Sequence, residues 1–88
     1  GLAIMTNNEK LNQIFSRVLD INIGDIKDII SPANTPSWDS FNTMLLVSEI
    51  ENEFSIQFTM EEIFKVKCIR DMKLYIEEKG VENITSKL

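Results

Sequence analysis

Residues 37–47 have the sequence SWDSFNTMLLV, and the interpretation of the whole chain starts from this stretch. Asp39 and Ser40 stand directly before a run of apolar residues with helical spacing. Both residue types are preferred at helix N-caps, because their side-chain oxygens accept hydrogen bonds from free backbone N–H groups. The pair therefore predicts a helix, which we place over residues 40–54. Its predicted inward face consists of Phe41, Leu46, Val47, Ile50 and Phe54.

A first helix is predicted over residues 7–19, where apolar residues recur at the i, i+3, i+4, i+7 and i+8 spacing of an amphipathic helix. Thr6 and Glu9 form a capping box at its start. The connection over residues 20–39 contains one glycine and two prolines, which argue against a continuous helix. It also contains five isoleucines, so we expect it to lie against the core, with a short helical turn around residues 25–30.

Two more helices follow the predicted helix over residues 40–54. A short one is predicted over residues 60–66, after a second capping box formed by Thr59 and Glu62. The last is predicted over residues 69–79, with Gly80 as a natural C-cap. Because no segment has a convincing strand pattern, the fold class is all-α: a four-helix bundle with a long first loop and a short third helix.

A chain of 88 residues is at most one small domain. We assign residues 7–80 to that domain. Residues 1–6 are expected to be an N-terminal tail, partly an expression remnant, and residues 81–88 a frayed C-terminal tail. The single cysteine, Cys68, is expected to be a small buried hydrophobe, and a domain without disulfides suggests the reducing cytoplasm. No apolar run approaches the roughly 20 residues that cross a bilayer, so no membrane partner is expected.

The charge of the chain is unevenly distributed. The net charge is −5, and residues 20–64 contain nine acidic residues and only one base, Lys27. This acidic middle argues against nucleic acid as a partner, because phosphates require Lys and Arg. It favours basic protein partners, although a merely solubilising surface is the simpler alternative. We interpret a later group of bases as a solvated face: Lys65, Lys67, Arg70 and Lys73.

The chain contains no histidine. Ser-His and Cys-His nucleophilic pairs and histidine metal sites are therefore excluded, and no metal site is predicted. Paired-carboxylate chemistry needs only acids, but a chain of this size can scarcely build a buried active-site cleft. The sequence predicts a protein without catalytic activity.

The pattern around Ser40 resembles that of the acyl carrier and peptidyl carrier superfamily. In that family an Asp-Ser-Leu motif opens the second helix, which ends in an acidic stretch closed by Phe. Here Asp39, Ser40 and Phe41 hold the motif positions, and residues 51–54, Glu-Asn-Glu-Phe, hold the acidic end. The Trp38-Asp39-Ser40 form is similar to that of stand-alone carriers. The resemblance covers roughly residues 7–79.

The resemblance implies that Ser40 is esterified to 4′-phosphopantetheine, which comes from coenzyme A. The thiol of the arm would carry acyl or aminoacyl groups as thioesters. Implied partners are a phosphopantetheinyl transferase, an adenylating or acyl-loading enzyme and a downstream acyl-acceptor enzyme, acting on a monomeric carrier. A helix start also suits a phosphate, because the helix dipole is positive there. Two other serines are weaker candidates: Ser37 is not followed by a helix start, and Ser48 lies inside the helix.

The chain departs from the family pattern at several positions. Phe41 stands where Leu is usual, and we expect it to face the core. Asn42 and Leu45 occupy positions that are often acidic in carriers of fatty-acid synthesis, which favours a specialised biosynthetic pathway. Trp38 is expected to pack and close one end of the bundle. The candidate partner-docking residues are Asp39, Met44, Leu45, Glu49, Glu51 and Glu53.

Two alternatives belong to other functional classes. In the first, the carrier fold serves only as a protein-binding adaptor and Ser40 is an unmodified cap residue. In the second, the acidic cluster serves a small enzyme. The sequence does not identify the cargo.

Overall fold

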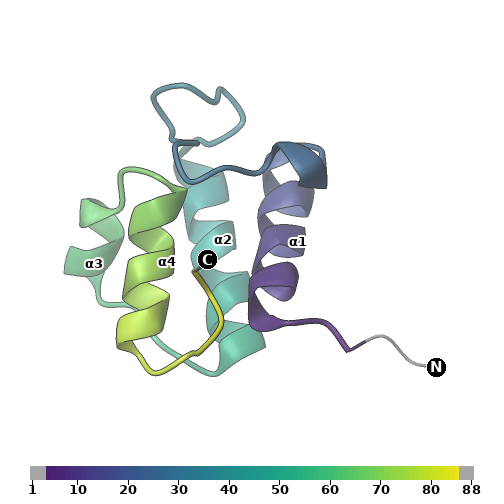
Figure 1. Cartoon of the computed structure of the whole chain (residues 1–88). Helices are drawn as coiled ribbons and strands as arrows, with labels where there is room; N and C mark the ends of the chain where they lie inside the picture. Colours follow the sequence, from purple (N-terminus) through teal and green to yellow (C-terminus); the bar gives the residue numbers. More distant parts are fainter. Residues whose placement is uncertain (1–3, 86–88) are drawn as a thin grey trace.

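The computed structural model describes residues 4–85, and all regular structure in that part of the chain is helical (Figure 1). The elements in order are α1 (Asn7–Leu19), the 3-10 helix η1 (Ile23–Asp25), α2 (Ser40–Phe54), α3 (Met60–Lys65) and α4 (Ile69–Glu78). The predicted all-α architecture, with a long first loop and a short third helix, is confirmed. None of the described helices combines the length and the apolar character that a membrane crossing requires.

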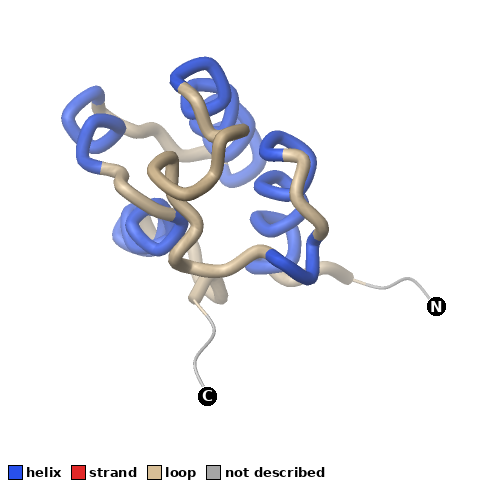
Figure 2. Tube along the Cα trace, turned by 90° about the horizontal axis from the view of Figure 1, so that it is seen from above, coloured by secondary structure: helices blue, strands red, loops and turns tan. Residues whose placement is uncertain are grey.

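The helices pack around α2, which lies between α1 and α4, while α3 covers the outer side of α4 (Figure 1). α1 runs antiparallel to α2, and α4 runs in the same direction as α2. The starts of α2 and α4 therefore lie at one end of the bundle. Figure 2, which looks onto that end, shows the connection between α1 and α2 lying across it.

The core is built from one face of each long helix, as the apolar spacing predicts. Among residues 4–85, twelve apolar residues are buried: Leu11, Ile14, Phe15, Leu19, Trp38, Leu46, Val47, Ile50, Ile69, Met72, Ile76 and Ile84. All but two of these residues lie on helices, and the two exceptions, Trp38 and Ile84, come from the segments before α2 and after α4. These two segments therefore belong to the folded domain.

Helix ends follow their capping residues. In the capping box before α1, Thr6 Oγ1 accepts from the Glu9 N–H at 3.1 Å, and the Thr6 N–H donates to Glu9 Oε1 at 2.8 Å. An equivalent box precedes α3. The helices α1 and α2 have the predicted bounds, whereas α3 and α4 each end one residue early. Gly80 follows the last turn of α4 with a φ of +96°, a conformation that favours glycine.

The first loop departs from prediction. The helical turn expected at residues 25–30 is instead a 3-10 turn at Ile23–Asp25. The residues that follow this turn bind the start of α4. The Ile30 carbonyl accepts from the Ile69 N–H at 2.9 Å, and the Asp28 carbonyl accepts from the Arg70 N–H at 3.1 Å. Because Cys68 gives α4 no side-chain cap, these loop carbonyls satisfy free N–H groups of its first turn.

An ion pair strengthens this contact between the loop and α4. Lys73 is only 8% exposed, and its Nζ donates to Asp28 Oδ1 at 2.9 Å. Lys73 therefore does not belong to the solvated basic face that we predicted, because its partner comes from the loop. Lys65 does pair on the surface, with Glu61 at 3.1 Å. Cys68, expected to be buried, is only partly so.

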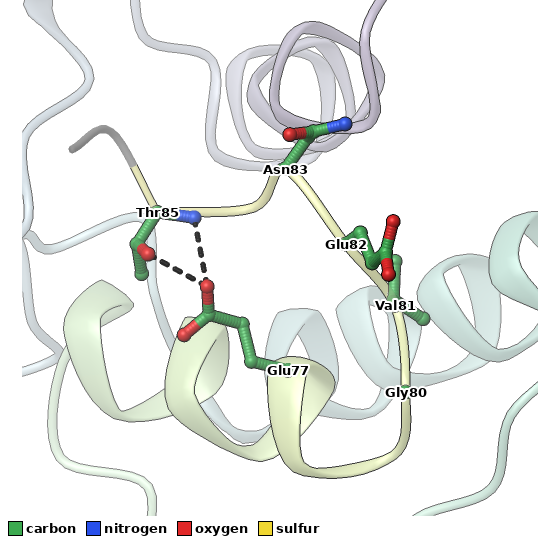
Figure 3. A pocket seen from close by; sticks show the side chains of 6 residues that line it. All are labelled: Glu77, Gly80, Val81, Glu82, Asn83 and Thr85. Atoms are coloured by element: carbon green, nitrogen blue, oxygen red, sulfur yellow. Dashed lines mark hydrogen bonds between the residues drawn. The ribbon is translucent and has the colours of Figure 1, made fainter.

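The segment after α4 also differs from prediction. Residues 81–85 are not frayed, because Ile84 is completely buried in the core. Asn7 Nδ2 donates to the Glu82 carbonyl at 2.9 Å, which ties this segment to α1. Thr85 Oγ1 donates to Glu77 Oε2 at 2.6 Å, which ties it to α4 (Figure 3). The outer parts of both predicted tails, residues 1–3 and 86–88, lie outside the described residues.

Ile84→Ala is expected to lower the free energy of unfolding by about 2 kcal/mol, because it removes buried methylene and methyl groups and leaves a cavity. Urea denaturation of both proteins measures this difference. Ile29→Ala is the matched control, since Ile29 is 74% exposed and its truncation should change stability by no more than about 0.5 kcal/mol. Equal denaturation midpoints for the Ile84 variant and the native protein would show that residues 81–85 add nothing to the core.

Glu62 joins α3 to the end of α4. Both of its carboxylate oxygens lie 2.9 Å from Lys79 Nζ, which also lies 5.4 Å from the centre of the Phe58 ring. The Thr59 N–H donates to the same carboxylate at 2.9 Å. The hydrogen bond from Lys79, followed by the one from the Thr59 backbone, lowers the pKa of Glu62 below its ordinary value.

Glu62→Gln is expected to destabilise the protein by about 1 kcal/mol at neutral pH and not at all in acid. A Gln side chain can still accept the capping-box hydrogen bond from the Thr59 N–H, so the substitution removes only the negative charge of Glu62. A lowered pKa in the folded state means that the stabilisation is complete above the unfolded pKa of about 4.3 and is lost as the pH falls through the lower folded value. Thermal melts between pH 7 and pH 3 should therefore converge. Glu61→Gln, which alters an exposed pair, is the control; a pH-independent difference for Glu62→Gln contradicts the assignment.

Candidate functional site

The candidate site is the start of α2, where Asp39 caps the helix and Ser40 exposes its hydroxyl group. Asp39 is the N-cap: its Oδ1 accepts from the Asn42 N–H at 2.8 Å, and its backbone is extended. Ser40 is the first helical residue and is exposed. The cap that the Asp-Ser pair predicted is therefore Asp39. The hydroxyl of Ser40 makes no hydrogen bond to any described residue, so it is available for chemistry.

The approach to Ser40 is fixed by Trp38. Its side chain is 2% exposed, and its ring lies 6.5 Å from that of Phe15 on α1, tilted by 46°. Trp38 Nε1–H donates to Thr43 Oγ1 at 2.9 Å, and this hydroxyl donates to the Asp39 carbonyl at 3.0 Å. The prediction that Trp38 packs against the bundle is confirmed. Since these contacts lie on both sides of Ser40, the serine is held on a fixed helix end.

The two other candidate serines lie in less suitable places. The Ser37 side chain is half-buried, and its carbonyl accepts from Asn42 Nδ2 at 2.7 Å. Ser48 is exposed but lies in the middle of α2, where every N–H of the helix is used internally. Of these three serines, Ser40 alone combines an exposed hydroxyl with a helix N-terminus, where backbone N–H groups and the helix dipole favour a phosphate.

The predicted acidic docking residues on α2 are engaged within the protein. Glu49 pairs with Arg17 of α1. Glu53 lies 3.9 Å from Lys10 Nζ, also on α1. Glu51 Oε2 accepts from the Phe58 N–H at 2.8 Å, beyond the end of α2. The structure therefore uses these three carboxylates to join α2 to its neighbours.

The predicted apolar docking residues are accessible, and Phe41 joins them. Phe41 is 75% exposed, so the prediction that it faces the core is wrong. The helical phase of Phe41 explains its exposure, because residues four apart lie on the same face of a helix. Phe41 precedes the partly exposed Leu45 by four residues, whereas it precedes the buried Leu46 by five. Met44 is 49% exposed, and Leu45 is partly exposed, as expected from its phase. The same phase, applied to Phe41, would have predicted its exposure.

The site can present a hydroxyl group but has no residues that would activate it. The sequence lacks histidine, and residues 4–85 contain no group of three or more Cys, Asp or Glu side chains placed to hold a metal ion.

Comparisons with known proteins agree with this geometry. A family model described as the phosphopantetheine attachment site matches residues 38–76, which include Trp38, Ser40 and the helices α2 and α3. The group that such a site attaches is 4′-phosphopantetheine. No curated protein gave a significant match to the chain.

A solved structure with the same fold is that of a protein designated an acyl carrier protein from Mycobacterium tuberculosis. The TM-score is 0.73 at 21% sequence identity, and the match covers 81% of this chain and 95% of that one. An attachment site holds a group for other enzymes, which agrees with the predicted absence of catalytic activity. The chain is therefore similar to phosphopantetheine attachment sites over residues 38–76 and has the fold of this acyl carrier protein structure.

Proposed function

We propose that Ser40 carries the 4′-phosphopantetheine arm and that this protein holds acyl or aminoacyl groups on it as thioesters. The observation that supports this most is the exposed Ser40 hydroxyl at the first position of α2, beside a cap that Asp39 provides alone. The residues present fit the group, because the start of a 15-residue helix is a favourable place for a phosphodiester.

Attachment is a phosphoryl transfer from coenzyme A. Ser40 Oγ attacks the phosphorus that bears the pantetheine, an Oγ–P bond forms, and the P–O bond of the diphosphate breaks. Adenosine 3′,5′-bisphosphate leaves, and the serine proton passes to a base of the transferase. Once attached, the arm supplies the thiol that forms the thioester.

The proposed partners act in succession on the same arm. A phosphopantetheinyl transferase installs it, an adenylating or acyl-loading enzyme charges it, and a downstream enzyme accepts the group. We place this cycle in a specialised biosynthetic pathway in the cytoplasm, with the carrier as a monomer. The uncharged residues Asn42 and Leu45 beside the serine support a specialised role, and the single cysteine is compatible with a reducing compartment. Contacts in such a cycle should be small and transient.

The experiment incubates the protein with coenzyme A and a broad-specificity phosphopantetheinyl transferase and measures its intact mass. A gain of one phosphopantetheine, located by fragmentation to the segment around Ser40, is the expected result. An unchanged mass, under conditions that fully modify a known carrier, contradicts the proposal. It favours instead an unmodified adaptor that keeps only the fold.

A further inference from the structure

The third residue of α2 is used differently from the third residues of α1 and α3. In α1 and α3 that residue is a glutamate, Glu9 or Glu62, whose carboxylate accepts a hydrogen bond from the backbone N–H of the capping threonine. In α2 the third residue is Asn42, and its side-chain Nδ2 donates to the Ser37 carbonyl at 2.7 Å. The polar side chain at this position therefore binds the segment that leads to Ser40.

Two side-chain hydrogen bonds enclose Ser40. The first joins Asn42 to Ser37, and the second is the bond of 2.9 Å from Trp38 Nε1–H to Thr43 Oγ1. Each bond joins residues five positions apart, so Ser40 lies inside both of the loops that they close. Both bonds are partly buried, which strengthens them relative to bonds in full contact with water. A segment closed twice in this way has few alternative conformations.

The contact made by Asn42 requires a hydrogen-bond donor, because a backbone carbonyl can only accept. An amide nitrogen satisfies the Ser37 carbonyl, whereas an ionised carboxylate of the same shape would place an oxygen against it. The helix alone would favour a carboxylate, since a negative charge in the first turn interacts well with the helix dipole. An asparagine at this position is therefore explained by the contact with Ser37 and not by the stability of α2.

We propose that Asn42 is a positioning residue for attachment of the arm. Its amide holds residues 37–40 in one conformation, so that Ser40 Oγ is already aligned when the modifying enzyme docks. Without this donor the segment is free to take other conformations, and the hydroxyl is misaligned in part of the complexes that form. The inference rests on the proposed function, since the reaction in question is the modification of Ser40.

The test measures kcat and KM for transfer of phosphopantetheine from coenzyme A by a broad-specificity transferase. Asn42→Asp keeps the shape of the side chain and removes its donor. It is expected to lower kcat about tenfold and to change KM less than about twofold, because a misaligned hydroxyl impairs transfer within the complex and not docking. Asn52→Asp, the same substitution at an exposed position of the same helix, is the matched control and should change kcat less than about twofold.

A second variant separates the lost donor from the added charge. Asn42→Ala removes the amide without introducing a carboxylate, so its kcat should fall by about the same factor as that of Asn42→Asp. Melting temperatures close to that of the native protein would show that neither loss comes from unfolding.

Hydrogen exchange tests the same role in the carrier alone, without the transferase. The exchange rate of a backbone N–H reports how often its hydrogen bond opens. In both Asn42 variants, exchange should accelerate by about fivefold or more at Trp38, whose N–H donates to the Thr35 carbonyl at 2.9 Å. It should stay unchanged at Ile50, which is completely buried further along α2.

The possible results separate this inference from the proposed function. A native kcat in both Asn42 variants, or a loss confined to KM, overturns the inference and leaves Ser40 as the attachment residue. Equal losses in Asn42→Asp and Asn52→Asp overturn it as well, because added charge would then be the cause. If the native protein is not modified at all, the proposed function fails and this inference fails with it.

Discussion

Ser40→Ala is expected to retain the fold and to take up no phosphopantetheine. The fold should persist because Asp39 provides the N-cap and the Ser40 side chain is exposed, without a hydrogen bond to any described residue. Alanine is the best helix former, so the free energy of unfolding should change by no more than about 0.5 kcal/mol. The loss of modification should nevertheless be complete, because the attacking oxygen has been removed. Intact-mass measurement after incubation with coenzyme A and a transferase checks the loss of modification.

Two matched variants make this result specific. Ser37→Ala and Ser48→Ala remove the other two serines of the segment and should be modified to the same extent as the native protein. A gain of one phosphopantetheine in Ser40→Ala would assign the arm to another residue. Loss of modification in all three variants would point to a folding defect or to an altered docking surface, which thermal melts distinguish.

Local sequence signals predicted the helices well. The capping boxes at Thr6 and Thr59 fixed the starts of α1 and α3, because each box is formed by residues three apart. The Asp-Ser pair fixed the start of α2, and Gly80 marked the end of α4 within one residue. In each case the interactions that decide the boundary are made within one turn of the helix, so the sequence alone contains them.

Contacts between distant segments were not predictable in the same way. Glu49 pairs with a residue 32 positions away, and Lys73 with one 45 positions away. A helical pattern places such side chains on a face but does not say which element covers it. Ile84 comes after Gly80, where the last helix is predicted to end, and the residues around it have no apolar spacing of a helix or strand. No local pattern therefore marks Ile84 as a core residue.

Phe41 has a different explanation. The family resemblance, in which an apolar residue follows the serine, suggested a core position, whereas helical phase places it with Leu45 on the outer face. An apolar residue at this position is thus compatible with a contact surface as well as with packing. The correction changes the view of the site, because it places an exposed aromatic ring directly beside Ser40.

Trp38→Ala should be the most destabilising of the substitutions considered. Trp38 is 2% exposed, contacts Phe15 across the bundle, and donates a hydrogen bond to Thr43. Truncation of a buried aromatic side chain of this size costs about 3–5 kcal/mol. The total stability of an 88-residue domain is about 4–13 kcal/mol at the usual value per residue, so this single substitution should remove a large fraction of it. Urea denaturation followed by circular dichroism measures the difference.

Trp38→Phe separates packing from hydrogen bonding. The smaller ring keeps part of the contact with Phe15 but cannot donate to Thr43 Oγ1, so an intermediate loss of about 1–2 kcal/mol is expected. Thr43 still donates to the Asp39 carbonyl in that variant, so the start of α2 should persist and Ser40 should remain open to modification. If Trp38→Ala instead denatured at the same urea concentration as the native protein, the indole would not close the bundle. The fixed position of Ser40 would then depend on the Asp39 cap and the Asn42–Ser37 contact alone.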